Sequence, residues 1–276
     1  RSAARARQRA ASQGRSASNF SEESPGMLPD GGRGQPRGSP AQGSGLAAGA
    51  ALVVQRITQG DEPGAERLLQ ALRRQHQQRG GKVIHHTLLN ESAQRGRLDA
   101  AEWCLKKMLA AGVQLNTVTM NCMLNACAKA GDVRHAVNWW DRMMWFGLKP
   151  TGITYNTMIV ACARAQDPAR AELWILRMIQ DGFLPCVVSF STVVGAFARA
   201  GLVAKAEEWH ARMREAGVAP DAISYSLLIT ACASAGEQSR AEHWLGEMRR
   251  DGLEPSSRLR GSLAHAGARA GHADPA

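Results

Sequence analysis

The sequence has few aromatic residues, no long apolar run and no paired cysteines. Aromatic residues make up 5% of the chain, as seven Trp, five Phe and two Tyr. No uncharged apolar run approaches the roughly 18 residues of a membrane span, so we expect no membrane partner. None of the six cysteines has CxxC spacing and no histidine cluster accompanies them, which argues against a zinc site. We therefore expect buried free thiols and a reducing compartment rather than a disulfide framework.

What the chain does have is enough apolar content for a core and an excess of positive charge. Hydrophobic residues make up 44% of the 276 residues, which excludes wholesale disorder. The formal net charge of +10 indicates an anionic partner, although a total does not locate the charge.

The first 45 residues differ in composition from the rest of the chain. Residues 1–45 are rich in Arg, Ser, Ala, Gly, Pro and Gln, so we expect a disordered basic leader. The first twenty contain five arginines and no acid, which is typical of a mitochondrial or plastid transit peptide. A basic low-complexity leader without a targeting role is the alternative. Because the chain does not begin with Met, we also expect it to be a fragment of a longer protein.

A strict period of 35 residues dominates the remainder. Glycine recurs with this spacing at Gly112, Gly147, Gly182, Gly217 and Gly252. Series of Met, Pro, Ala and Trp keep the same phase, so the pattern defines five repeat units. The units are 82–116, 117–151, 152–186, 187–221 and 222–256. A degenerate unit at 46–81, which keeps only its second half, precedes them, and a truncated unit or tail at 257–276 follows.

Each unit predicts two helices. In 152–186, "ITYNTMIVACARA" reads as an apolar helix and "DPARAELWILRMIQDG" as an amphipathic one. Gly182 suits a helix C-cap and Pro185 prevents the helix from continuing. One helix pair cannot bury its apolar face alone, so we expect the units to stack into an all-α solenoid. The Trp series is expected to fill the core between units, with a base-stacking platform as the alternative.

These residues resemble pentatricopeptide repeats. The resemblance rests on "ITYNTMIVACARAQDPARAELWILRMIQDGFLPC" and "TVTMNCMLNACAKAGDVRHAVNWWDRMMWFGLKPT", is strong over 82–256 and is weak in the flanking units. Tetratricopeptide repeats, with 34 residues and other packing residues, fit less well. The resemblance implies a right-handed α-solenoid that binds single-stranded RNA, one base per repeat, without a cofactor. It also implies a mitochondrial or plastid location and a role in RNA processing, stability, editing or translation.

The resemblance further implies which residues read the bases. The fifth and last residues of a unit would contact the base edge. The fifth residues are His86, Asn121, Asn156, Ser191 and Ser226. The last residues are Asn116, Thr151, Cys186, Asp221 and Ser256. By the family code the expected site is 5′-N-Y-Y-G-R-3′, with guanine at the unit of Ser191 and Asp221. Solvated turn or helix-cap positions are the alternative for each residue.

Two further positions have roles implied by the family. The second residue of each unit would sandwich the base ring, and these residues are Val83, Val118, Ile153, Val188 and Ile223. Packing between units is the alternative for them. The thirteenth residue would contact phosphate at Lys129, Arg164 and Arg199, whereas Gln94 and Ser234 depart from this pattern.

The distribution of charge within the units favours the same surface. The first fourteen residues of the five units hold Lys82, Arg95, Lys129, Arg164 and Arg199 against a single acid, Glu91. Stacked first helices therefore predict a mildly basic wall that suits a phosphate backbone. The alternative is that buried first helices simply avoid carboxylates.

No motif points to catalysis. The sequence has no HExxH, no deaminase HxE…CxxC set and no Gly-rich phosphate loop, so we expect neither an enzyme nor a small-molecule substrate in this chain. A catalytic domain would require sequence outside it. A scaffold that binds protein partners without reading RNA remains the alternative function.

Overall fold

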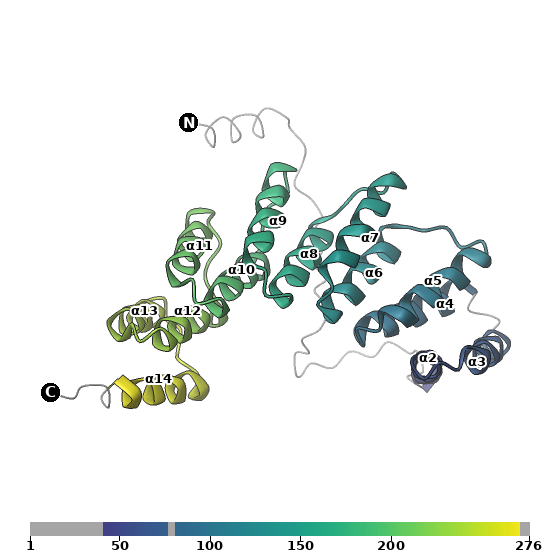
Figure 1. The fold of residues 1–276 in the computed structure, drawn as a ribbon, viewed down its shortest axis with the longest axis horizontal. Helices are drawn as coiled ribbons and strands as arrows, with labels where there is room; N and C mark the ends of the chain where they lie inside the picture. Colours follow the sequence, from purple (N-terminus) through teal and green to yellow (C-terminus); the bar gives the residue numbers. More distant parts are fainter. Residues whose placement is uncertain (1–40, 77–80, 271–276) are drawn as a thin grey trace, which may run out of the picture. The chain divides into compact units, whose positions relative to one another are not determined.

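The computed structural model describes residues 41–76 and 81–270, and side chains from Gly45 to His76 and from Gly81 to Leu263. The predicted leader, apart from its last few residues, lies outside this part of the chain. The described residues form helices joined by short turns and contain no strand (Figure 1). No helix among them is long and apolar enough to cross a membrane.

The helices form consecutive pairs that follow the 35-residue period. The pairs are α2 (Ala41–Thr58) with α3 (Glu62–Gln75), α4 (Gly81–Gln94) with α5 (Leu98–Ala110), α6 (Thr117–Ala130) with α7 (Val133–Trp145), α8 (Gly152–Arg164) with α9 (Pro168–Gln180), α10 (Val187–Arg199) with α11 (Val203–Glu215), and α12 (Ala222–Ser234) with α13 (Gln238–Arg250). A single helix, α14 (Ser257–Ala270), follows the last pair.

The first helices of the pairs form one continuous row. Each of α2, α4, α6, α8 and α10 contacts the first helix of the next pair, and α12 contacts α14. Each second helix packs on its own first helix, and all of them except α13 also pack on the first helix of the following pair. This arrangement confirms the prediction of an all-α helical repeat solenoid.

Small and flexible side chains let the helices approach closely. The in-phase alanines, such as Ala136 and Ala171, are fully buried, and Met143 and Met178 fill the space beside them. In the periodic Trp series, Trp139 and Trp209 are buried and Trp174 and Trp244 are half-buried against the core, so this series packs in the core and does not form a base-stacking platform. The six cysteines are free; four are buried, Cys122 is half-buried and Cys186 is exposed.

The outer edge of the core also links neighbouring units. The indole Nε1 of Trp209 donates a hydrogen bond to Glu172 Oε1 of the preceding unit at 3.0 Å, and Trp244 Nε1 donates to Glu207 Oε1 at 2.7 Å. Lys205 also pairs with Glu172, at 3.4 Å. These hydrogen bonds fix the rotation of one unit relative to the next, and so the register of the first-helix row.

The degenerate unit contains a complete helix pair. The sequence pattern predicts only its second helix, but α2 is present and buries Leu46, Val53 and Val54. Helix α2 begins at Ala41, inside the segment assigned to the leader. Helices α2 and α3 approach closely at Gly49, where a Cβ would lie 2.4 Å from Leu72 Cδ2.

Candidate nucleic-acid interface

The second residues of the units form an exposed apolar line along the first-helix row. Val83, Val118, Ile153, Val188 and Ile223 are between 45% and 67% exposed, although each lies in the first turn of a helix whose other apolar residues are mostly buried. This exposure does not fit the alternative in which these side chains pack between units. It leaves them available to a planar ligand.

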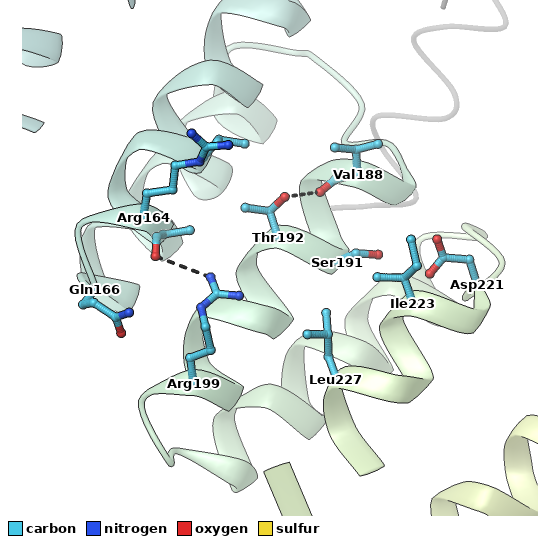
Figure 2. A pocket seen from close by; sticks show the side chains of 11 residues that line it. Arg164, Gln166, Val188, Ser191, Thr192, Arg199, Asp221, Ile223 and Leu227 are labelled. Atoms are coloured by element: carbon cyan, nitrogen blue, oxygen red, sulfur yellow. Dashed lines mark hydrogen bonds between the residues drawn. The ribbon is translucent and has the colours of Figure 1, made fainter. Parts of the chain in front are cut away.

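A hollow of about 580 Å³ brings three of the predicted classes of residue together between α8, α10 and α12. Its lining includes Val188 and Ile223, Ser191 and Asp221, and Arg164 and Arg199. Figure 2 shows Ser191 and Asp221 beside Val188 and Ile223 at one side of the hollow, and the two arginines at the other. Gln166, Thr192 and Leu227, which the sequence pattern does not single out, complete the wall.

The last residues of the units are helix N-caps. Asn116 Oδ1 accepts a hydrogen bond from the Thr119 N–H and Asp221 Oδ1 from the Ser224 N–H, both at 2.8 Å. Thr151 and Ser256 cap through their hydroxyls, more weakly. The cap alternative is therefore correct as a structural role, but it uses only one side-chain oxygen of Asp221. Oδ2 of Asp221 has no hydrogen-bond partner among the described residues.

The fifth residues differ in what already occupies their polar atoms. Asn121 Oδ1 accepts from the Thr154 hydroxyl at 2.8 Å, and Asn156 Oδ1 accepts from the Ser189 hydroxyl at 2.6 Å. The Ser226 hydroxyl donates to the carbonyl of Ala222 in its own helix at 2.6 Å. His86 is half-buried at the start of the row.

Ser191 stands apart because its hydroxyl is buried and unpartnered. The residue is 8% exposed, and its Oγ has no hydrogen-bond partner in the described structure. Leaving such a group unpaired costs about 1–3 kcal/mol. Since Ser191 lines the hollow, a polar ligand group placed there would remove this cost.

The predicted phosphate contacts lie at the C-terminal ends of the first helices. We call Lys129, Arg164 and Arg199 the basic row. Lys129 Nζ donates to the Gln94 carbonyl at 2.8 Å and to Gln94 Oε1 at 2.9 Å, and Arg199 Nη2 reaches the Ala163 carbonyl at 3.4 Å. None of the three pairs with a carboxylate in the described part of the chain.

Elsewhere the predicted basic wall is partly neutralised. Arg95 Nε lies 2.8 Å from Glu91 Oε1 on the same helix, so this pair presents no net charge. The positive surface is therefore concentrated in the middle of the array.

The described residues contain no cluster of metal ligands, and most of their thiols are buried. Among them, no group of three or more His, Cys, Asp or Glu side chains could hold a metal ion. The thiols of Cys104 and Cys127 are buried, and burial raises the pKa of each to about 12, which makes them poor nucleophiles.

A second groove, of about 490 Å³, lies on the second helices between α5 and α7. Leu109, Trp145 and Phe146 form its apolar walls, and Trp145 is 81% exposed. Lys106 and Arg142 also line it, and neither pairs with a carboxylate in the described part of the chain. This groove is separate from the first-helix row.

Comparisons with known proteins agree with this architecture. The family model described as the pentacotripeptide-repeat region of PRORP matches residues 72–261. No curated protein sequence matches the chain significantly.

Solved structures provide further matches. The pentatricopeptide repeat protein PPR10 in complex with an 18-nt psaJ RNA element is 28% identical, with a TM-score of 0.63 over 80% of this chain and 32% of that one. PPR10 from maize gives 24% identity and a TM-score of 0.59, over 80% and 31% of the two chains.

A third structure shows the same fold. The PPR domain of Arabidopsis thaliana protein-only RNase P 1, in complex with tRNA, is 19% identical with a TM-score of 0.56, over 65% of this chain and 95% of that domain. The present chain spans about a third of the PPR10 chain. Because the family model covers more than half of the sequence, and the paired helices repeat every 35 residues, the chain belongs to the pentatricopeptide repeat family.

Proposed function

We propose that the chain binds single-stranded RNA selectively, one base per unit, along the first-helix row. The observation that carries this proposal is the hollow between α8, α10 and α12. It combines exposed aliphatic side chains, an unpartnered hydroxyl, a carboxylate with one oxygen unpartnered, and two arginines that pair with no carboxylate in the described residues. Each of these matches one part of a nucleotide. PPR10, the similar protein with an RNA element in its structure, supports the same class of ligand.

A nucleotide would use the hollow as follows. Its base ring lies between Val188 and Ile223, which belong to successive first helices and line the same space. The base edge faces Ser191 and Asp221, and Arg199 is available to the phosphate. The second and fifth positions recur every 35 residues, so each unit would place one base along the row.

The chemistry of Ser191 and Asp221 favours guanine. Guanine presents N–H donors at its N1 and N2 positions beside the O6 acceptor. Asp221 Oδ2 can only accept a hydrogen bond when ionised, and the Ser191 hydroxyl can donate or accept. Together with the family code this gives the proposed site 5′-N-Y-Y-G-R-3′, with the protein N-terminus at the RNA 5′ end.

Replacing Asp221 with Asn tests this reading in the full chain. Asn is as good an N-cap as Asp, so Oδ1 still accepts from Ser224 while an NH₂ replaces Oδ2. We expect preference at this base to change from G to A, by about 1–3 kcal/mol, the scale of one base-edge contact in DNA readout. Affinities for four RNAs that differ only at this base, measured for both proteins, provide the comparison.

The outcomes separate the possibilities. RNAs that differ at the neighbouring third base serve as the control, because Asn156 and Cys186 are unchanged. If the unmutated protein binds all four RNAs equally, this unit does not read sequence and the proposal is wrong.

The cellular role follows as a second part of the proposal. The arginine-rich, acid-free start of the leader and the family resemblance support a mitochondrial or plastid location and a role in organelle RNA metabolism. Five fully specified bases would occur by chance about once per thousand nucleotides, and the site 5′-N-Y-Y-G-R-3′ specifies less than that, so a unique transcript requires further repeats or a partner.

One observation favours the alternative function of a protein-binding scaffold. The groove between α5 and α7 would accept a partner helix with aliphatic side chains between Leu109 and Trp145 and carboxylates beside Lys106 and Arg142. This surface lies on the second helices, so it is compatible with RNA on the first-helix row. Equal affinities in the four-RNA experiment would make it the leading function.

A further inference from the structure

A chain of hydrogen bonds connects the two base-reading residues of unit 117–151 through the next unit. The backbone N–H of Thr151 donates to Thr154 Oγ1 at 3.0 Å, and Thr154 Oγ1 donates to Asn121 Oδ1 at 2.8 Å. Thr154 is the third residue of unit 152–186 and is fully buried. Its hydroxyl therefore bridges the last and fifth residues of the preceding unit.

The same bridge recurs one unit later. The backbone N–H of Cys186 donates to Ser189 Oγ at 3.1 Å, and Ser189 Oγ donates to Asn156 Oδ1 at 2.6 Å. Ser189 is 1% exposed. Two units with different side chains at the third position thus place a hydroxyl in the same role.

These hydrogen bonds determine which end of the amide is available. A backbone N–H can only donate, so the bridging hydroxyl accepts there and has its own proton for the amide oxygen. The Oδ1 atoms of Asn121 and Asn156 are consequently directed toward the bridging hydroxyls, and the NH₂ groups are the ends left for a base. Asn156 Nδ2 has only a long contact of 3.7 Å to Cys186 Sγ.

Unit 187–221 lacks this bridge. Ser224, at the equivalent third position, accepts from the Asp221 N–H at 3.0 Å but donates to the Asp221 carbonyl at 2.8 Å. It does not reach Ser191, whose hydroxyl stays unpartnered. The third-position hydroxyl therefore orients the fifth residue only where that residue is Asn.

We propose that Thr154 and Ser189 are positioning residues that set base preference in the preceding units by holding the amide of Asn121 and Asn156 with its NH₂ toward the base. This inference rests on the proposed RNA-binding function. An NH₂ donor suits the O2 acceptor that cytosine and uracil share, so the bridge selects pyrimidines without separating the two. A released amide could turn its oxygen to the base and accept from purine N–H groups instead.

The test is Thr154→Val in the full chain, which keeps the shape of the side chain and removes the hydroxyl. We expect the preference for pyrimidine over purine at the second base to fall about fivefold, the effect of one hydrogen bond of roughly 1 kcal/mol. Preference at the third base, which Asn156 reads, should not change. Thr154→Ser, which restores the hydroxyl found naturally at Ser189, should restore the preference.

The controls separate positioning from general stability. Ser224→Ala removes an equally buried third-position hydroxyl that does not contact a fifth residue, so preference at the fourth base, which the preceding unit 187–221 reads, should persist. Loss of affinity for all RNAs in parallel, with preference intact in Thr154→Val, would overturn the inference. Should Thr154→Val not fold, the same test uses Ser189→Ala, and the preference for pyrimidine over purine is then measured at the third base. Absence of any pyrimidine preference in the unmutated protein would instead refute the proposed function itself.

Discussion

Removing the basic row should change how RNA affinity depends on salt. The change is the simultaneous replacement of Lys129, Arg164 and Arg199 by Ala. Because none of the three pairs with a carboxylate in the described structure, each charge is available to a phosphate without breaking an ion pair. Lys129 would exchange two hydrogen bonds to the neutral Gln94 for a phosphate contact. We therefore expect three phosphate contacts along this row.

Three contacts give a defined magnitude. Each phosphate contact on a single strand contributes about 0.7 to the slope of log affinity against log salt, so the triple variant should lose about 2 from the slope. Between about 50 and 200 mM salt, the unmutated protein should then lose about 20-fold more affinity than the variant. Fluorescence anisotropy with a labelled RNA that contains the proposed site, at four or five salt concentrations, measures both slopes.

A matched control removes the same charge from the second helices. Lys106, Arg134 and Arg249 are exposed there and lie away from the hollow, so their replacement by Ala lowers the net charge equally. If local contacts with phosphate set the slope, the slope of this control should stay near that of the unmutated protein. Equal slopes for the basic-row variant and the unmutated protein would refute the assignment of the basic row to phosphate contacts. If the slope falls equally in both variants, the effect comes from net charge and not from contacts of the basic row.

Two further predictions concern stability. His210 is fully buried, and burial together with nearby Arg214 lowers its pKa to about 4. Since an unfolded histidine titrates near 6.5, the free energy of unfolding should fall by about 3 kcal/mol as the pH drops from 6.5 to 4. His210→Leu should remove this part of the pH dependence, measured by urea unfolding at several pH values. An unchanged pH dependence in the variant would contradict the assignment to His210. Gln166 has φ of +60°, where the equivalent residues of other units are glycine, so Gln166→Gly should raise the free energy of unfolding by about 1 kcal/mol. A urea midpoint that does not rise would show that this backbone is unstrained.

Most of the fold is predictable because each unit contains its own start and stop signals. Helices α6, α8, α10 and α12 begin at the first residue of the units defined by the period. Asn116, Thr151 and Asp221 provide the caps at these starts, and Gly131, with φ of +72°, ends α6. Helix α2 could not be predicted in this way, because it packs through close approach at Gly49 and has none of the periodic markers.

The 35-residue period predicts which residues form the candidate site, but it does not predict the hydrogen-bond partners of their polar atoms. The sequence places Ser191 and Ser226 at equivalent positions of adjacent units. In the structure the Ser226 hydroxyl is bonded to the carbonyl of Ala222, whereas the Ser191 hydroxyl is unpartnered. Hydrogen-bond partners that are 33 residues apart, such as Asn121 and Thr154, depend on how units stack. One signal was nevertheless present, since a hydroxyl residue occupies the third position of four units, at Thr119, Thr154, Ser189 and Ser224.

These differences predict that the fifth and last residues alone do not determine which base a unit prefers. A fifth-position Asn presents a donor when a hydroxyl of the next unit occupies its oxygen, and either end of its amide when no such hydroxyl is there. Likewise, Ser191 has a free hydroxyl beside Asp221 Oδ2, while Ser226 must give up a hydrogen bond within its helix before it can donate to a base. The unit of Ser191 should therefore discriminate more strongly than the unit of Ser226, although both have serine at the fifth position.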